Sequence, residues 1–441
     1  MMTRDVVILF VLAVFFNASR AAEWTVSPLK LEQSRRIAID RLQQCTDDGN
    51  CLDENFNDIL SAWWNLGTFP QNYKRALPFM LSNGIRNELE GRLEESLACA
   101  KRGRPNCLIH LVFDTFNAKR YNVHSSLTKS INFAELKPQI QNQLVQMAPW
   151  NSKNNRLSKK IRPDPHTLDF LLVFSWAAFR VGIDFDKGWK TEDLLEWFEV
   201  LRPYPIPGVT MKDTEYRHTR PLTIAIMHAI YVVGEFGLAT VNLEAFRTEH
   251  DYLRNAFVAA NQYRDYELMG EIIDVLDVAG AKRNYKNVER LLKFQNSEDV
   301  AVEGNTYRGV GTWGRSAEDI NNLHQHYVCT LALFERGGKR FKKQEKYLFW
   351  TNKKYWGIVG DLFPDLFSRQ GKTQKLQPKP HKSDPVKKND MKEMHHLQFI
   401  YSKFPFRRLV FPLLAIGIFL FTFALCFRAV IRTDLEDRKS L

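Results

Sequence analysis

The segment LVFPLLAIGIFLFTFALCFRAV, residues 409–430, decides how the rest of the chain is organised. Thr422 and Cys426 carry its only weakly polar side chains before Arg428. A bilayer core of ~30 Å requires about twenty helical residues at a rise of ~1.5 Å each, so this run is long enough to cross it. The sequence therefore predicts one C-terminal transmembrane helix at 409–430, followed by a cytoplasmic tail at 431–441.

The first residues have the pattern of a secretory signal. Arg4 supplies a positive charge, VVILFVLAVFF at 6–16 supplies an apolar core, and small residues precede Ala22. This order is typical of a signal peptide, and the core is too short to span a bilayer. We expect a signal peptide at 1–21 and a single-pass type I membrane protein of the secretory pathway, in the ER, the Golgi or at the cell surface. The bulk of the chain is then luminal or extracellular.

Charge is concentrated in front of the predicted membrane helix. Residues 338–408 carry 18 Lys or Arg and six Asp or Glu, which accounts for the net charge of +12. We expect a basic Lys/Pro-rich stalk at 369–408. It is either a solvated spacer or a surface that attracts anionic lipid or an acidic polymer. Nucleic acid is not an expected partner, because the chain has no recognisable nucleic-acid-binding motif.

Four of the six cysteines form two closely spaced pairs. Cys45 and Cys51 enclose five residues, and Cys99 and Cys107 enclose seven. In an oxidising compartment this spacing predicts two local disulfides, although three connectivities are open for four cysteines. The spacings do not match a C-x₂-C zinc motif, so no metal is expected there. Cys329 is expected to be a buried thiol.

Apolar residues recur at helical spacing through most of the chain, and its first half shows no alternating strand pattern. The expected fold is all-α: a multi-helical ectodomain of stacked α-hairpins, which can close into an α/α toroid, plus the transmembrane helix. A polar, proline-terminated stretch at 150–165 marks a boundary. We expect an N-terminal helical region with the two disulfides at 22–149 and a central helical domain at 150–368.

One polar constellation stands out in the central domain. His228 lies in the apolar run PLTIAIMHAIYVVGEFG, and Glu235 follows seven residues later, at a spacing that places both on one face of a helix. Glu271 and His326 lie on two later helices. If the hairpins pack around an axis, these four side chains converge on a central cavity and can perform acid–base catalysis. The alternative is structural, with hydrogen-bonded core histidines and acids on a solvated face.

Three segments of this domain, HTRPLTIAIMHAIYVVGEFG, DYELMGEIIDVLDVAG and HQHYVCTLALF, resemble an uncharacterised bacterial α-helical domain family of unknown function. The resemblance covers about 218–334. It implies an α-helical architecture and a single domain over this region, and it brings no assigned activity.

Two functional hypotheses are compatible with these patterns, and a purely structural membrane component is a third possibility. The first, which the sequence favours, is a binding or scaffold module that contacts protein partners through helical faces and is held to the bilayer by 409–430. The second is a membrane-tethered hydrolase or glycan-processing enzyme that uses the Glu, Asp and His residues of 228–326. A deep pocket containing at least two of the four candidates within hydrogen-bond reach favours the enzyme. A filled axis, with those side chains on the outside, favours the binding module. No cofactor or metal is expected, because no H-E-x-x-H, phosphate-loop or nucleophile-elbow motif is present.

Overall fold

The computed structural model describes residues 27–102, 105–123, 126–148, 162–205, 212–298, 300–302, 305–307, 310–314, 316–336, 341–342 and 349–367. All of these residues belong to the first of the two units into which the chain divides, residues 1–372. Several predicted segments lie outside the described residues: the signal peptide, the stalk, the transmembrane helix with Cys426, and the tail. Among the helices that are described, none combines the length and the apolar character needed to cross a membrane.

The described part of the first unit is predominantly helical, which confirms the expected all-α class. Its strands are short: β1 pairs in parallel with β4, and β2 pairs antiparallel with β3. In chain order, the elements are α2 (Pro28–Asp47), α3 (Gly49–Glu54), α4 (Phe56–Gly67), α5 (Tyr73–Met80), α6 (Asn83–Lys101), α7 (Pro105–Arg120), α8 (Ser126–Ser130), α9 (Phe133–Met147), α10 (Pro165–Val181), α11 (Thr191–Leu201), α12 (Asp213–Val233), β1 (Ala239–Thr240), η2 (Leu243–Phe246), α13 (Arg247–Tyr263), α14 (Tyr266–Val278), α15 (Tyr285–Leu292), β2 (Val300–Val302), β3 (Asn305–Tyr307), α16 (Ala317–Asn321), α17 (Leu323–Ala332), β4 (Phe341–Lys342), α18 (Asn352–Leu362) and α19 (Pro364–Phe367).

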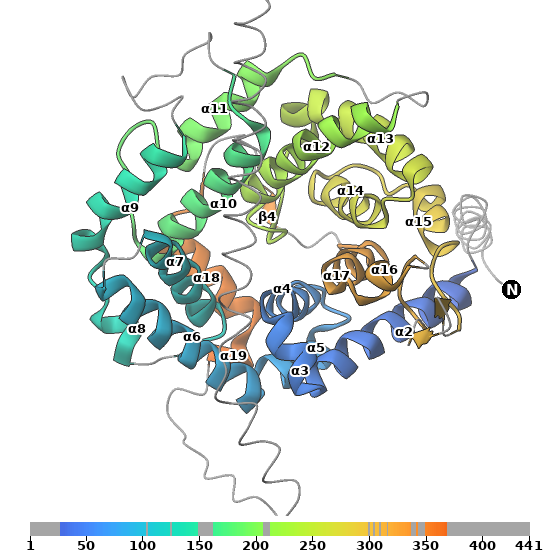
Figure 1. The fold of residues 1–441 in the computed structure, drawn as a ribbon, viewed down its shortest axis with the longest axis horizontal. Helices are drawn as coiled ribbons and strands as arrows, with labels where there is room; N and C mark the ends of the chain where they lie inside the picture. Colours follow the sequence, from blue (N-terminus) through green and yellow to red (C-terminus); the bar gives the residue numbers. More distant parts are fainter. Residues whose placement is uncertain are drawn as a thin grey trace, which may run out of the picture. The chain divides into compact units, whose positions relative to one another are not determined.

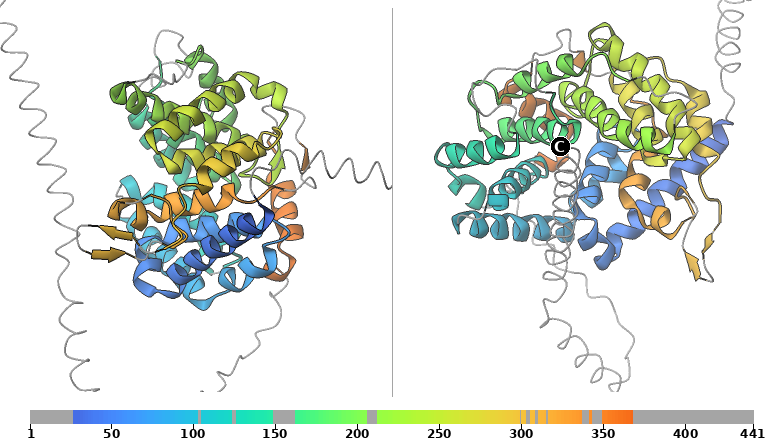
Figure 2. Two further views of the ribbon diagram at one scale, coloured as in Figure 1. Left: turned by 90° about the vertical axis from the view of Figure 1, so that its right-hand side faces the viewer. Right: turned by 45° about the horizontal axis from the view of Figure 1, so that its top comes forward.

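Six of the described helices, α4, α7, α10, α12, α14 and α17, form an inner ring in the order of the chain (Figure 1). Helix α17 contacts α4, which closes the ring. At the α4–α7 junction, the Tyr121 hydroxyl donates a hydrogen bond to the Leu60 carbonyl oxygen at 2.5 Å. Helices α2, α6, α9, α11, α13 and α15 lie outside the inner ones in Figure 1, and the side view of Figure 2 (left) shows the blue helices of 28–101 below the green and yellow helices of 213–292.

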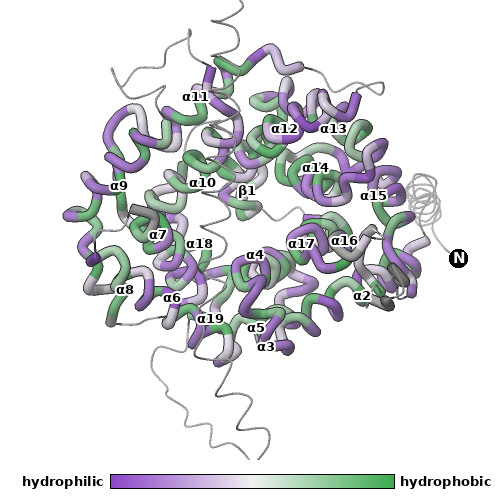
Figure 3. Tube along the Cα trace, in the orientation of Figure 1, coloured by the Kyte–Doolittle hydropathy of each residue, from purple (hydrophilic) through white to green (hydrophobic). Residues whose placement is uncertain are grey.

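The inner helices bury apolar residues because they pack against two neighbours and an outer helix. Leu171, Leu172 and Phe174 of α10 are fully buried, as are Ile226 and Ile230 of α12. Figure 3 shows α10 as mainly hydrophobic, whereas the outer helix α13 carries a hydrophilic side. A helix with one hydrophilic side, such as α13, therefore suits the outer layer, and a helix without one, such as α10, suits the inner ring.

Helices α18 and α19 cover the end of the ring at which α4, α7 and α10 terminate. The ring of Phe363 packs against that of Trp64, with centroids 4.4 Å apart. The Asn122 side chain donates a hydrogen bond to the Leu366 carbonyl oxygen at 2.8 Å. The central space is therefore closed at this end by aromatic and aliphatic packing.

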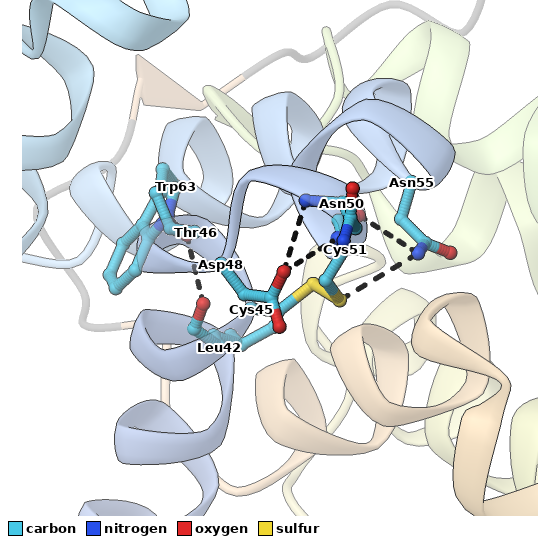
Figure 4. Close-up of a disulfide and its surroundings, with 8 residues drawn as sticks. All are labelled: Leu42, Cys45, Thr46, Asp48, Asn50, Cys51, Asn55 and Trp63. Carbon is cyan, nitrogen blue, oxygen red and sulfur yellow. Dashed lines mark hydrogen bonds between the residues drawn. A yellow bond between two sulfur atoms is a disulfide. The ribbon is translucent and has the colours of Figure 1, made fainter. Parts of the chain in front are cut away.

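Both predicted local disulfides are formed. Cys45 and Cys51 join α2 to α3, and Cys99 and Cys107 join α6 to α7, with Cα–Cα distances of 5.1 and 5.5 Å. Figure 4 shows the first, where the Asp48 carboxylate caps α3 by accepting hydrogen bonds from backbone amides, including that of Cys51. Each disulfide pins a turn between consecutive helices. Cys329 is a buried free thiol, as expected.

Candidate functional site

A cavity of about 440 Å³ lies inside the ring, and all six inner helices contribute to its wall. Along each helix the lining residues recur every three or four positions, so each helix presents one face to the cavity. Its titratable lining residues are Asp58, His110, Asp114, Arg120, His228, Tyr231, Glu271, Asp274, His324, Tyr327 and Arg336. Its aromatic wall includes Phe113, Phe116, Phe170, Trp176 and Phe236.

His324 of α17 lies at the centre of a cluster of carboxylates. Its Nδ1 is 2.8 Å from Asp58 Oδ1 on α4. Its Nε2 is 3.5 Å from Glu271 Oε1 and 3.9 Å from Glu267 Oε1, both on α14. The His324 side chain is 41% exposed and that of Glu271 only 7% exposed, so the cluster extends inward from the open part of the cavity.

The carboxylates fix the charge of His324. Burial alone would lower the pKa of this imidazole, but hydrogen bonds to Asp58 and Glu271, together with their negative charges, raise it to about 11. His324 is therefore an imidazolium at neutral pH. It holds two carboxylates from different helices close together without itself being free to accept a proton.

His228 of α12 forms a second imidazole–carboxylate pair. Its Nδ1 is 2.5 Å from Asp169 Oδ1 on the neighbouring helix α10. Burial opposes the charged form, but the charge and hydrogen bond of Asp169, and the charge of Glu271, raise the pKa of His228. Because Asp169 engages Nδ1, the second ring nitrogen, Nε2, is available to a ligand in the cavity.

Two further carboxyl groups near the cavity, those of Glu267 and Asp114, have raised pKa values. Burial raises the pKa of Glu267, and the negative charge of Glu271 adds to the effect. Burial also raises the pKa of Asp114, although the Ser96 hydroxyl donates a hydrogen bond to this carboxylate. The site thus combines carboxyl groups of high proton affinity with imidazolium groups, which is the composition that proton transfer requires.

The deep wall of the cavity is held by an ion pair. Arg336 donates to Asp274 through Nε at 2.5 Å and Nη2 at 2.6 Å, and both side chains are 1% exposed. The Tyr231 hydroxyl donates to the same carboxylate at 2.9 Å. Because each charge is compensated at close range, this group has a structural role.

Of the four residues predicted from the sequence, the structure brings His228 and Glu271 to the cavity and places Glu235 elsewhere. Glu235 is fully buried, accepts hydrogen bonds from Arg180 Nη2 at 2.6 and 2.7 Å, and accepts another from Trp176 Nε1 at 2.8 Å. The seven-residue spacing does not place Glu235 on the same face as His228, because α12 ends at Val233 and Glu235 adopts φ = +53°.

His326 lies on the opposite side of α17 from the cavity. Its Nε2 is 2.9 Å from the Ala38 carbonyl oxygen on the outer helix α2, and burial lowers its pKa to about 4. Two residues correspond to roughly 200° around a helix, so His324 and His326 cannot face the same way. The spacing of His324 with Tyr327 and Leu331 is the signal that identifies the cavity face of α17.

No protein-family model, curated protein or solved structure matches this chain. Within the described residues, no group of three or more His, Cys, Asp or Glu side chains is arranged to hold a metal ion.

Proposed function

We propose that the helical unit is an α/α toroid and that its central cavity is the active site of a hydrolase acting on saccharides. One observation carries the proposal: His228 and His324, each joined to carboxylates from other helices, reach the same cavity as Glu271. Charged groups that served only to hold the helices together would not need to surround an open space.

The geometry supports distinct roles for these groups. Oriented by Asp169, the His228 imidazolium donates a proton to the leaving oxygen as the bond from that oxygen to the sugar breaks. Glu271 accepts a proton from the water whose oxygen forms the new bond to the same carbon. His324 is a positioning residue, because its contacts with Asp58 and Glu271 hold both carboxylates against the cavity wall. Atoms balance as the addition of one water.

The cavity wall supports a saccharide as the substrate class. Phe113, Phe170 and Trp176 contribute broad apolar surfaces to the same wall as the polar residues. A sugar ring has apolar C–H faces and a polar rim, so such a wall suits it. The volume of about 440 Å³ falls within the range of small-molecule sites, ~300–1,000 Å³.

The same proposal includes the membrane topology expected from the sequence. A signal peptide at 1–21 and an anchor at 409–430 would place the cavity in the lumen or outside the cell, above a stalk that attracts anionic lipid or an acidic polymer. The two disulfides support an oxidising compartment. Protease added to sealed microsomes should leave the helical unit intact. Its digestion before detergent is added would contradict this topology.

The test of hydrolysis uses the full-length chain in detergent and a panel of 4-methylumbelliferyl glycosides. We expect fluorescence release by the wild type, and losses of about 100-fold or more in kcat for His228→Gln and for Glu271→Gln. His218→Gln is the matched control, because His218 is exposed on the same helix and lies outside the cavity. Absence of turnover across the panel, or equal rates in all three variants, would reject the hydrolase.

A binding module is the second candidate. It is favoured by the charge balance of the cluster, in which carboxylates raise the pKa of both histidines, that of His324 to about 11. In that case, isothermal titration would detect saccharide or peptide binding by the wild type, with no turnover of any glycoside.

A further inference from the structure

Arg120, the last residue of α7, is a buried cation in the cavity wall. Its side chain lines the cavity, and the residue is only 8% exposed. Its Nε is buried without a hydrogen-bond partner. Within the part of the chain that the structure describes, Arg120 forms no ion pair and donates no hydrogen bond.

Other buried arginines of this unit are paired with buried carboxylates. Arg180 is matched by Glu235, and Arg336 is matched by Asp274. An arginine left unpaired in a low-dielectric interior destabilises the fold, because its charge has lost its hydration without gaining a counter-charge. Arg120 is therefore the exception among the buried arginines, and an anionic ligand in the cavity would compensate its charge.

The surroundings of Arg120 stabilise its position without neutralising its charge. The guanidinium carbon lies 4.3 Å from the ring centroid of Trp64 and 5.1 Å from that of Phe116. These are cation–π contacts, which attract the guanidinium without accepting hydrogen bonds from its N–H groups. Burial lowers the pKa of Arg120, and the groups that act on its charge are Tyr121, Tyr327 and Tyr355, with no carboxylate among them.

Tyr327 offers a second donor at the same place. Its hydroxyl oxygen accepts a hydrogen bond from Asn65 Nδ2 at 2.6 Å. No described residue accepts the Tyr327 hydroxyl proton in return. Tyr327 and Arg120 both line the cavity, so together they present a planar cation and a hydroxyl donor to whatever occupies it.

We propose that Arg120 and Tyr327 bind the carboxylate or sulfate group of an acidic saccharide. This inference rests on the proposed function only for the identity of the rest of the molecule. A guanidinium matches the planar fork of a carboxylate and also binds sulfate oxygens. Tyr327 follows His324 by one helical turn, a rise of about 5 Å along α17. An acidic group held here places the adjoining part of the same small molecule beside His324 and Glu271.

The charge distribution of the cavity sets the orientation of this ligand. Asp58, whose side chain is 32% exposed, repels an anion at the open part of the cavity, whereas Arg120 attracts it deeper in the wall. The acidic end therefore enters first, and the bond to be cleaved stays near the carboxylate cluster.

The test is isothermal titration of the full-length chain in detergent with glucuronate, galactose 6-sulfate and neutral galactose. We expect the wild type to bind at least one acidic sugar about 10-fold or more tightly than galactose. Arg120→Leu and Tyr327→Phe should lose this preference, and Arg120→Lys should retain part of it. The two acidic probes separate a carboxylate ligand from a sulfate ligand.

Arg92→Leu is the matched control. Arg92 also stacks on an aromatic ring, that of Phe56 at 4.4 Å, but it pairs with Glu88 and does not line the cavity. Its removal should leave the acidic preference unchanged. A thermal scan without ligand completes the design. If Arg120 serves to bind a ligand, Arg120→Leu should have a melting temperature no lower than that of the wild type. If Arg120 serves only to hold the fold, the melting temperature of Arg120→Leu should fall clearly.

Equal binding of acidic and neutral sugars by the wild type, or an unchanged preference in Arg120→Leu, overturns the proposal. The outcome is separable from that of the hydrolase. Loss of acid binding in Arg120→Leu with no glycoside turnover in the wild type rejects the enzyme and keeps the anion site. Turnover of neutral glycosides by a wild type that shows no preference for acidic sugars keeps the enzyme and rejects the anion site.

Discussion

The backbone of Gly270 on α14 lies directly against that of Cys329 on α17. A Cβ added at Gly270 would lie 2.8 Å from the Cys329 amide nitrogen and 2.9 Å from its Cα. This contact brings α14 and α17 closer than a side chain would allow. The neighbouring residue Glu271 is therefore held within 3.5 Å of His324.

Replacing Gly270 with Ala should destabilise the fold, because the backbone of α17 must move away. We expect a loss of about 1–3 kcal/mol in the free energy of unfolding, as for other overpacked cores. The measurement is urea denaturation followed by circular dichroism. Gly91→Ala is the control: Gly91 lies inside α6 with nothing within 4 Å of an added Cβ. There the higher helix propensity of Ala should raise stability by up to about 1 kcal/mol. Equal losses in both variants would contradict the close contact.

The buried pair of Asp274 and Arg336 should respond asymmetrically to substitution. Asp274→Asn leaves the Arg336 charge buried and uncompensated, so we expect a loss of about 3–5 kcal/mol in unfolding free energy. The double variant Asp274→Leu/Arg336→Met should recover most of that loss, because it removes both charges. Asp213→Asn is the surface control: it breaks an exposed pair with Arg217 and should change stability by no more than about 0.5 kcal/mol.

His326 should make the fold sensitive to acid. Its pKa is lowered to about 4 by burial, whereas the unfolded chain keeps a value near ~6.5. Stability contributed by the neutral imidazole is complete above pH ~6.5 and is lost as the pH falls toward 4, amounting to about 3 kcal/mol. His326→Gln should therefore show a smaller fall in unfolding free energy between pH 7 and pH 4.5. Identical pH profiles for the variant and the wild type would refute this assignment.

Asp169 should control the protonation of His228. Because the charge and hydrogen bond of Asp169 raise the pKa of this buried imidazole, Asp169→Asn should lower it. The imidazolium would then be lost at a lower pH. The measurement is an NMR titration of ¹⁵N-labelled histidine side chains, which requires no knowledge of the substrate. The signals of exposed His218 on the same helix should not respond, and an unchanged His228 titration would exclude the pairing.

Features encoded by residues close together in the chain could be predicted from the sequence. Helical spacing of apolar residues identified the all-α class, because burying one face of a helix requires that spacing locally. The two cysteines of each pair, Cys45–Cys51 and Cys99–Cys107, lie on consecutive helices joined by a short turn. Each cysteine therefore has one other cysteine close to it in the chain. His228 and Glu271 were recognisable as polar residues within apolar helices.

Contacts that depend on closure of the ring could not be predicted. Asp58 and His324 are 266 positions apart and meet only because α17 packs beside α4. Glu235 follows the end of α12 in a left-handed conformation, which no spacing argument anticipates. Arg120 resembles any helix-terminal arginine until the fold buries it without a carboxylate.

The sequence by itself determined the helices, the local disulfides and the expectation of an anchor, because each depends on the composition of one short stretch. Only the tertiary structure decided which polar side chains share the cavity. Distant helices choose their facing sides by packing their apolar residues together, and the few charged groups on the inner faces are brought into contact as a consequence.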